Sequence, residues 1–192
     1  MENTPDSKPR HGIIAEVSPW VQRFAPLVAQ GGTVLDLASG GGRHARYFLG
    51  LGHPVVAIDR DTGPLADLQG QAEVIQADLE EGAASAAAWG GRAFAGVVVC
   101  NYLHRPLMPY LLDAVAPGGV LIYETFARGN ERYAKPRNPD HLLEAGELLS
   151  LAGVRFQVIA YEHGLIEGRR VVQRIAAVNA PGDEAPRELY PG

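Results

Sequence analysis

Short apolar runs alternate with helix-forming stretches along most of this chain. Five runs have the length and composition of strands: Thr33–Leu37, Pro54–Ile58, Ala72–Gln76, Phe94–Cys100 and Gly119–Glu124. Short, mostly continuous apolar runs are typical of parallel strands that are buried on both faces. The pattern therefore predicts an α/β fold in which helices cover both faces of a mostly parallel sheet.

Helical patterns lie between these runs. Ser18 and Pro19 form a strong helix start, because serine caps a helix and proline fits its first position. Further helices are expected at Arg43–Leu51, Thr62–Leu68, Ala83–Trp89, Leu107–Val115 and Asp140–Leu151. Gly153 is expected to end the last of these helices.

Two more strands are expected near the C-terminus, at Val154–Tyr161 and Val171–Val178. The connection between them is too short for a helical crossover, so we expect an antiparallel hairpin. Together the elements predict a single domain with a seven-stranded sheet over residues 18–179. Residues 1–17 and 180–192 are rich in polar residues and proline, and a loosely ordered leader and tail are expected there.

Charge and composition restrict the function classes. A formal net charge of −5 argues against a dominant nucleic-acid-binding surface, although a local basic patch remains possible. No apolar run approaches the length of a membrane span, and the first residues lack the pattern of a secretion signal. The single cysteine, Cys100, suits a reducing compartment, so a cytoplasmic location is expected. No His/Cys cluster has metal-site spacing, and no metal is predicted.

A glycine turn follows the first strand and carries the strongest chemical signal. Gly40 and Gly42 allow a ligand to approach the backbone, and the helix that begins after them offers free N–H groups. Asp59 closes the next strand, about 20 residues after the turn, where an acid can bind ribose hydroxyls. Dinucleotides and S-adenosylmethionine share this geometry. Asp36, near the end of the first strand, would oppose a pyrophosphate but suits an amino group and a sulfonium cation.

The chain resembles the class I S-adenosylmethionine-dependent methyltransferases. Val34–Gly42 resembles their first motif, Asp59 the acid of their second motif, and Ala77-Asp78-Leu79 their third. Ala38 departs from the general motif, which has its first glycine there, but small bacterial members also use alanine. The stretch from Asp36 to His44 is similar to the small bacterial methyltransferases near the tellurite-resistance type.

This resemblance covers roughly residues 33–178 and implies both a fold and a cofactor. The fold is a Rossmann-like three-layer sandwich with strand order 3-2-1-4-5-7-6 and an antiparallel seventh strand. The cofactor is S-adenosylmethionine, the methyl donor. Nine residues are implied to bind it: Asp36, Ala38, Gly40, Gly42, Asp59, Arg60, Asp78, Leu79 and Asn101.

Individual donor roles follow from the resemblance. Asp36 would bind the amino group, Asp59 the ribose hydroxyls and Asp78 the adenine amino group. Arg60 would lie beside the adenine and Leu79 would pack on it. Two of these acids also have plain structural alternatives, because Asp78 is able to cap the next helix and Asp59 to serve as a turn residue.

Candidate acceptor residues follow the fourth and fifth strands, since ligands in open parallel sheets lie beyond the carboxyl ends of the strands. His104 is a candidate general base, Tyr102 a candidate neighbour of the sulfonium, and Glu124 a candidate base or acceptor ligand. The alternatives are a backbone-bonded helix start for His104, packing for Tyr102 and an ion pair for Glu124.

Basic residues gather in the loop after the fifth strand and at the hairpin. Arg128, Arg132, Arg137 and Arg170 are predicted to bind an anionic acceptor, with a solvated surface loop as the alternative. Asn101-Tyr102-Leu103-His104 lacks the two prolines of amino-directed DNA methyltransferases, which argues against DNA as a partner.

These observations predict a methyltransferase that acts on an unidentified small, anionic acceptor and has no membrane contact. Three alternatives stay open: an RNA or protein methyltransferase, a non-catalytic domain that binds S-adenosylmethionine, and a nicotinamide-dependent oxidoreductase. The last is kept because Gly40–Ala45 formally meets the dinucleotide glycine pattern. The sequence does not determine the oligomeric state.

Overall fold

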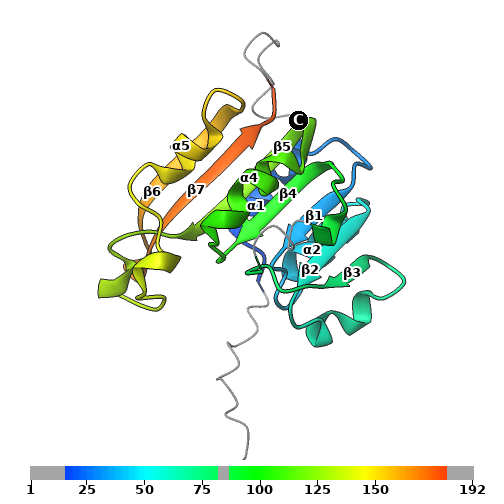
Figure 1. Cartoon of the computed structure of the whole chain (residues 1–192), viewed down its shortest axis with the longest axis horizontal. Coiled ribbons are helices and arrows are strands. Elements are labelled where there is room, and N and C mark those ends of the chain that lie inside the picture. The colour runs from blue at the N-terminus through cyan, green and yellow to red at the C-terminus, as the bar shows by residue number, and fades with distance from the viewer. Residues whose placement is uncertain (1–15, 82–86, 181–192) are drawn as a thin grey trace, which may run out of the picture.

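A computed structural model describes residues 16–81 and 87–180 (Figure 1). The parts of the expected leader, tail and alanine-rich helix at 1–15, 181–192 and 82–86 lie outside these residues. Seven strands form one sheet in the order β3-β2-β1-β4-β5-β7-β6, as predicted. The strands are β1 (Val34–Leu37), β2 (Val55–Asp59), β3 (Glu73–Gln76), β4 (Phe94–Cys100), β5 (Val115–Phe126), β6 (Gln157–Ile166) and β7 (Arg170–Val178).

Strand direction also agrees with the sequence analysis. β1 to β5 pair in parallel, whereas β7 pairs antiparallel with both β5 and β6. The central strands are buried on both faces, because every β1 side chain but Asp36, and most of those of β4, are apolar and pack against helices above and below. This arrangement brings the carboxyl ends of β1, β2, β4 and β5 to one edge of the sheet.

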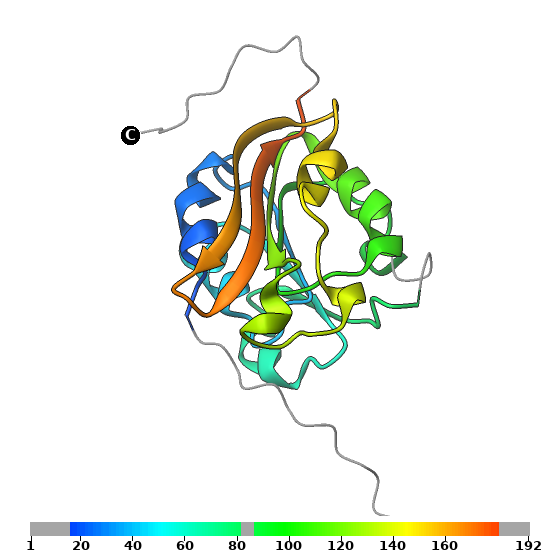
Figure 2. The same ribbon diagram turned by 90° about the vertical axis from the view of Figure 1, so that its left-hand side faces the viewer.

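Helices lie on both faces of the sheet and make three layers (Figure 2). One face carries α1 (Pro19–Phe24) and α2 (Arg43–Gly50), and the other carries α4 (Met108–Asp113) and α5 (Glu147–Ala152). The described residues also contain short 3-10 helices: η1 (Ala25–Leu27), η2 (Gly63–Leu68), η3 (Ala87–Trp89), η4 (Arg105–Leu107), η5 (Asn130–Arg132) and η6 (Pro139–His141). No helix in the described part of the chain has the length and apolar content needed to cross a membrane.

Several expected boundaries were wrong. The helix expected at Asp140–Leu151 is instead η6, an extended segment and the short helix α5, and the cap of η6 is Asn138 rather than Asp140. Leu143 pairs with the backbone of Phe126 and Arg128 beyond the end of β5. This pairing and the burial of Leu143 override the local helical pattern.

Other differences are smaller. The helices expected at 62–68 and 107–115 are a 3-10 helix over Gly63–Leu68 and the consecutive elements η4 and α4. β5 is longer than expected at both ends, and β6 begins and ends later than expected. At the start of β6, Val154 is fully exposed and Phe156 is buried just before the strand.

Candidate active site

The glycine turn between β1 and α2 has the backbone that a closely approaching ligand requires. Ala38, Gly40 and Gly42 have φ values of 53°, 55° and 74°, which lie in the left-handed region. A Cβ on Gly42 would lie 2.5 Å from Leu65 Cδ2, so only glycine fits there. A Cβ on Gly40 would meet no atom within 4 Å. The turn is therefore packed behind Gly42 and open in front of Gly40.

Asp59 lies directly against this turn. The parallel register pairs Leu37 with Ile58, which places the end of β2 beside the end of β1. The Gly40 N–H donates to Asp59 Oδ2 at 2.7 Å, and the Asp61 N–H donates to Oδ1 at 3.0 Å. Each carboxylate oxygen has a second lone pair, so the carboxylate is still able to accept from hydroxyl groups.

Asp36 is a buried carboxyl group at the end of β1. Its side chain is 1% exposed, and its Oδ2 accepts a hydrogen bond from the Ala45 N–H at 2.9 Å. Burial raises the pKa of Asp36 to about 7, and the Ala45 N–H and the Arg43 guanidinium offset only part of this effect. The carboxylate form would be favoured by a cation placed against it.

His44 faces Asp36 and was not singled out by the sequence analysis. Its Nδ1 lies 3.9 Å from Asp36 Oδ1, and its Nε2 accepts from the Ser18 N–H at 3.3 Å. Burial lowers the pKa of His44 to about 3, so the ring is neutral near pH 7. Its place at the start of α2 was visible in the sequence, but Ser18 lies 26 residues away and gave no signal.

The third candidate acid lies at the neighbouring strand end. The Ala77 N–H donates to the carbonyl of Asp59 at 3.0 Å, which brings the end of β3 beside the end of β2. Asp78 is exposed and accepts from the Glu80 N–H at 2.9 Å, whereas Leu79 is buried. Arg60 is exposed at the same edge.

The segment after β4 carries three buried polar atoms that have no hydrogen-bond partner within the described residues. They are Asn101 Oδ1, the Tyr102 hydroxyl and His104 Nε2. Buried polar atoms are normally paired, so three unpaired ones within four residues make this segment a candidate for ligand binding. Asn101 has a φ of 57°, and its N–H donates to the Glu124 carbonyl at 2.9 Å, which fixes the turn.

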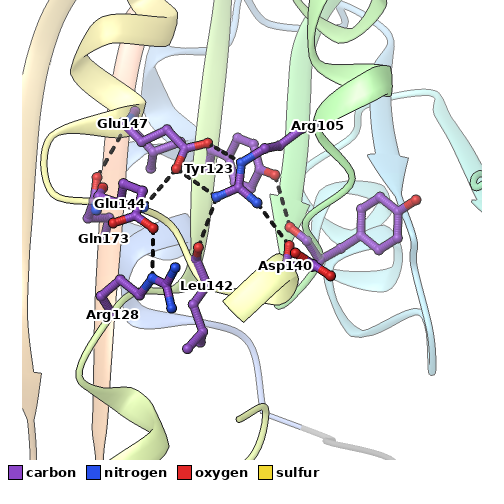
Figure 3. Close-up of polar contacts among 10 residues, drawn as sticks. Arg105, Tyr123, Arg128, Asp140, Leu142, Glu144, Glu147 and Gln173 are labelled. Carbon is purple, nitrogen blue, oxygen red and sulfur yellow. Dashed lines mark hydrogen bonds and ion pairs between the residues drawn. The ribbon is translucent and has the colours of Figure 1, made fainter. Parts of the chain in front are cut away.

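Tyr102 lies near the carboxylates at the end of β3. Burial raises the pKa of its hydroxyl well above its ordinary value, and Glu80 and Asp78 raise it further. The hydroxyl is therefore protonated at physiological pH. The backbone carbonyl of Tyr102 accepts from the Tyr123 hydroxyl at 2.9 Å, so β5 holds this segment from behind (Figure 3).

Glu124 is buried among partners at the end of β5. Its side chain is 2% exposed, with Oε1 accepting from the Ser18 hydroxyl at 3.2 Å and Oε2 from Arg174 Nη1 at 3.3 Å. Arg174 also bonds to Glu162 on β6. The structure thus places Glu124 in the ion pair that the sequence analysis kept as its alternative role.

The basic loop after β5 is anchored rather than loose. Asn130 is completely buried, its Oδ1 accepts from the Val171 N–H at 3.0 Å, and its Nδ2 donates to carbonyls within the loop. Arg128 donates from Nε to Glu144 Oε1 at 2.7 Å. Arg132 and Arg137 are exposed, and Arg170 is partly buried at the start of β7.

Arg105 joins the segment after β4 to α5 and was also missed. Its Nε and Nη2 donate to the two carboxylate oxygens of Glu147 at 2.7 and 2.9 Å (Figure 3). It also donates to the carbonyls of Asp140 and Leu142, both at 2.9 Å. These partners lie 35–42 residues away, so local sequence gave no signal for them.

Residues 16–81 and 87–180 show no candidate metal site. No group of three or more His, Cys, Asp or Glu side chains is placed there to hold a metal ion. The residues that converge at the sheet edge are instead single carboxylates, backbone N–H groups and unpaired side-chain atoms, which suit an organic ligand.

Comparison with known proteins gives sequence relatives of one kind. No family model matches the chain. It is 34% identical over 134 residues to a ubiquinone biosynthesis O-methyltransferase of Paraburkholderia phytofirmans and 33% identical over 134 residues to that of Paraburkholderia xenovorans. Each match covers 66% of this chain and 57% of the relative, so the chain spans little more than half the length of these curated relatives.

Solved structures share the fold at low sequence identity. TehB from Haemophilus influenzae superimposes with a TM-score of 0.68 at 16% identity over 88% of this chain and 64% of that one. The 1,6-didemethyltoxoflavin-N1-methyltransferase of Burkholderia thailandensis has a TM-score of 0.62 at 18% identity over 85% and 77%. The resemblance in the sequence motifs is thereby confirmed in three dimensions, and the chain has the fold of the class I S-adenosylmethionine-dependent methyltransferases.

Proposed function

We propose that this chain is an S-adenosylmethionine-dependent methyltransferase that acts on a small acceptor. The observation that carries the proposal is the glycine turn, which is open in front of Gly40 and flanked by the carboxyl groups of Asp36 and Asp59. The curated relatives are named as methyltransferases, and the toxoflavin methyltransferase structure contains S-adenosylhomocysteine. The residues present fit this donor.

The methionine half of the donor would lie along the glycine turn. Asp36 would meet its amino group, since a cation there favours the ionised carboxyl. Ala38, Gly40 and Gly42 would contribute backbone that a ligand is able to approach. The unpaired Oδ1 of Asn101 would accept a hydrogen bond at the same end.

The nucleoside half would lie over the ends of β2 and β3. Asp59 would accept from the ribose hydroxyls while it holds the Gly40 N–H. Asp78 would accept from the adenine amino group, with Leu79 packed on the ring and Arg60 beside it. The adjacent backbones of β2 and β3 support this shared role.

The bound donor supplies a methyl group already activated on its sulfonium, so the chain's task is to align the acceptor and exclude water. We propose His104 as the group that takes or orients an acceptor proton, because its Nε2 is buried and has no hydrogen-bond partner among residues 16–81 and 87–180. Tyr102, which stays protonated, would orient ligands through its hydroxyl. Glu124 would stabilise the site through Arg174 and Ser18 instead of acting as the base.

Cationic side chains support an anionic acceptor. Arg132, Arg137 and Arg170 lie on the loop and strand that follow the acceptor edge of the sheet. Arg128 contributes less to this proposal because it is paired with Glu144. A cytoplasmic location is part of the proposal too, supported by the buried, free Cys100.

Calorimetry with S-adenosylhomocysteine tests the donor site. Asp59→Ala should weaken binding by about 1–3 kcal/mol, the usual cost of losing hydrogen bonds to a charged group. Asp61→Ala is the matched control and should leave affinity nearly unchanged, because within the described residues the Asp61 carboxylate accepts a hydrogen bond from the nearby Gly63 N–H alone. Absence of binding by the parent chain would refute the proposal.

Turnover is tested separately from binding. A library of small carboxylated, phosphorylated, phenolic and neutral acceptors is incubated with S-adenosylmethionine, and S-adenosylhomocysteine is measured. Stoichiometric product with at least one acceptor is the expected outcome. Donor binding without turnover on any small molecule, RNA or protein would identify a donor-binding domain and contradict the catalytic proposal.

A further inference from the structure

The segment 16–18, here called the strap, contacts the carboxyl edge of the sheet before α1 begins. Arg43 Nη1 donates to the Glu16 carbonyl at 3.0 Å. The Ser18 N–H donates to His44 Nε2 at 3.3 Å, and the Ser18 hydroxyl donates to Glu124 Oε1 at 3.2 Å. Two of these partners belong to the helix that follows the glycine turn, so the strap is fastened directly to the proposed donor site.

The bond from Ser18 fixes the tautomer of His44. Because Nε2 accepts the Ser18 N–H, a neutral ring must carry its proton on Nδ1. Nδ1 is the atom that faces Asp36 Oδ1, at 3.9 Å. The ring is 3% exposed, so water does not easily replace either neighbour. The strap therefore decides which nitrogen presents a proton to Asp36.

Other charged and titratable groups surround this pair on all sides. They are Arg43 on the same helix, Asp59 at the end of β2, Cys100 at the end of β4 and Glu124 at the end of β5. Only Arg43 among them is a cation, and its guanidinium also donates to the Glu16 carbonyl. The Ala45 N–H and the Arg43 guanidinium favour the ionised form of Asp36. The Nδ1–H of His44 lies 3.9 Å from Asp36 Oδ1, beyond hydrogen-bond distance, and adds an N–H dipole beside the carboxyl group.

We propose that His44 is a positioning residue of the donor site: through Nε2 it holds the strap, and through Nδ1–H it supports the Asp36 carboxylate that meets the donor's ammonium group. The inference rests on the proposed function. It adds a residue that acts through Asp36 rather than on the donor, and it makes the strap part of the site.

Two amide variants separate the two ring contacts. His44→Gln places its amide near the Nε2 end and retains an acceptor for Ser18, whereas His44→Asn places its amide near Nδ1 and retains a donor for Asp36. Binding of S-adenosylhomocysteine is measured by calorimetry from pH 6 to pH 8.5. His44→Gln should bind about three- to tenfold more weakly than the parent at pH 6, yet within about twofold at pH 8.5.

For His44→Asn, the pH at which binding of S-adenosylhomocysteine is half-maximal should be the same as in the parent. A residue that only fills space would lower affinity by the same factor at every pH and in both variants. That result, or an unchanged profile in a folded His44→Gln variant, would overturn the inference while leaving the donor site intact. Failure of the parent to bind at any pH would instead refute the proposed function, and the inference with it.

Ser18 variants test the strap without touching His44. Ser18 has φ −60° and ψ 129°, a conformation that proline adopts, so Ser18→Pro removes the N–H donor with little backbone change. Ser18→Ala loses the hydroxyl but keeps that N–H. Nitrogen-15 shifts of the His44 ring in the ligand-free chain should show Nδ1–H in the parent and in Ser18→Ala, and a mixture in Ser18→Pro. The same tautomer in all three chains would overturn the role of the strap.

Discussion

The proposed donor side and the proposed acceptor side of the site are held in place by different kinds of contact. On the donor side, backbone N–H groups bind the carboxylates of the strand ends, as Gly40 binds Asp59 and Ala45 binds Asp36. Gly40 and Asp59 are 19 residues apart, and Ala45 and Asp36 are 9 residues apart. On the acceptor side, side chains connect distant segments, as Arg105 does with Glu147 over 42 residues.

The two sides should therefore differ in how strongly a single substitution affects them. Donor contacts depend on the register of neighbouring parallel strands and on one turn, so they persist as long as the sheet forms. Acceptor contacts depend on individual side chains such as Asn130 and Gln173, which tie a loop and α5 to β7. Substitutions on the acceptor side should therefore change the acceptor without disturbing donor binding.

The largest expected effect separates chemistry from donor binding. If His104 takes the acceptor proton, His104→Ala should lower turnover by about 10²–10⁴-fold and leave the affinity for S-adenosylhomocysteine nearly unchanged. Steady-state kinetics and calorimetry measure the two quantities. His141→Ala, an exposed histidine on η6, is the control. Loss of donor affinity with normal turnover at saturation would move His104 to the donor side.

Asp36→Asn sharpens the comparison, because it should stabilise the folded chain while it weakens donor binding. The pKa of Asp36 is about 7 in the folded chain, against an ordinary value of 3.8. The protonated Asp36 therefore makes its full contribution to the free energy of unfolding below about pH 4, and this contribution is lost as the pH rises through 7. The variant, which keeps an acceptor for Ala45, should gain about 2–4 kcal/mol relative to the parent between pH 4 and pH 8.

Urea unfolding at both pH values measures this gain. The same variant should bind S-adenosylhomocysteine at pH 8 about tenfold or more weakly, because it has no charge to offer an ammonium group. His44, whose pKa is lowered to about 3, acts in the opposite direction: its contribution is present above pH 6.5 and is lost as the pH falls. If the free energy of unfolding changed equally with pH in the parent and in Asp36→Asn, a buried, titrating Asp36 would be contradicted.

Asn130→Ala should break the acceptor side alone. It removes a completely buried side chain that bonds to Val171 and to two carbonyls of the loop. The free energy of unfolding should fall by about 2–3 kcal/mol, and the Michaelis constant for the acceptor should rise. Asn138→Ala, which loses only the exposed cap of η6, should cost about 0.5–1 kcal/mol. Equal loss of donor and acceptor affinity would show that the two sides are coupled.

The smallest effect concerns the charge of the acceptor. Arg132→Ala and Arg137→Ala should each raise the Michaelis constant for an anionic acceptor by about two- to fivefold, and added salt should do the same because it screens the attraction. Arg128→Ala should change the Michaelis constant less, because Arg128 is paired with Glu144 in the parent. A neutral best acceptor together with unchanged variants would identify the loop as a solvated surface.

The sequence by itself determined the sheet and the place of the donor-side acids. Parallel strands that are buried on both faces are apolar along their whole length, and the short link between the last two strands permits only an antiparallel hairpin. Asp36 and Asp59 were found from local pattern, because Asp36 lies near the end of the strand before the glycine turn and Asp59 closes the next strand about 20 residues after it. The order of the strands was implied by the family resemblance, and the structure confirms it.

Only the tertiary structure decided what the acceptor side is made of. The helix expected from Asp140 is broken because Arg105, 35 residues earlier, takes the Asp140 carbonyl and Leu143 pairs beside the end of β5. Glu124 gained its partners, and His44 its tautomer, from Ser18 and Arg174, which no local pattern connects to them. Side-chain pairing between distant segments depends on how the layers pack, and packing is a property of the whole chain.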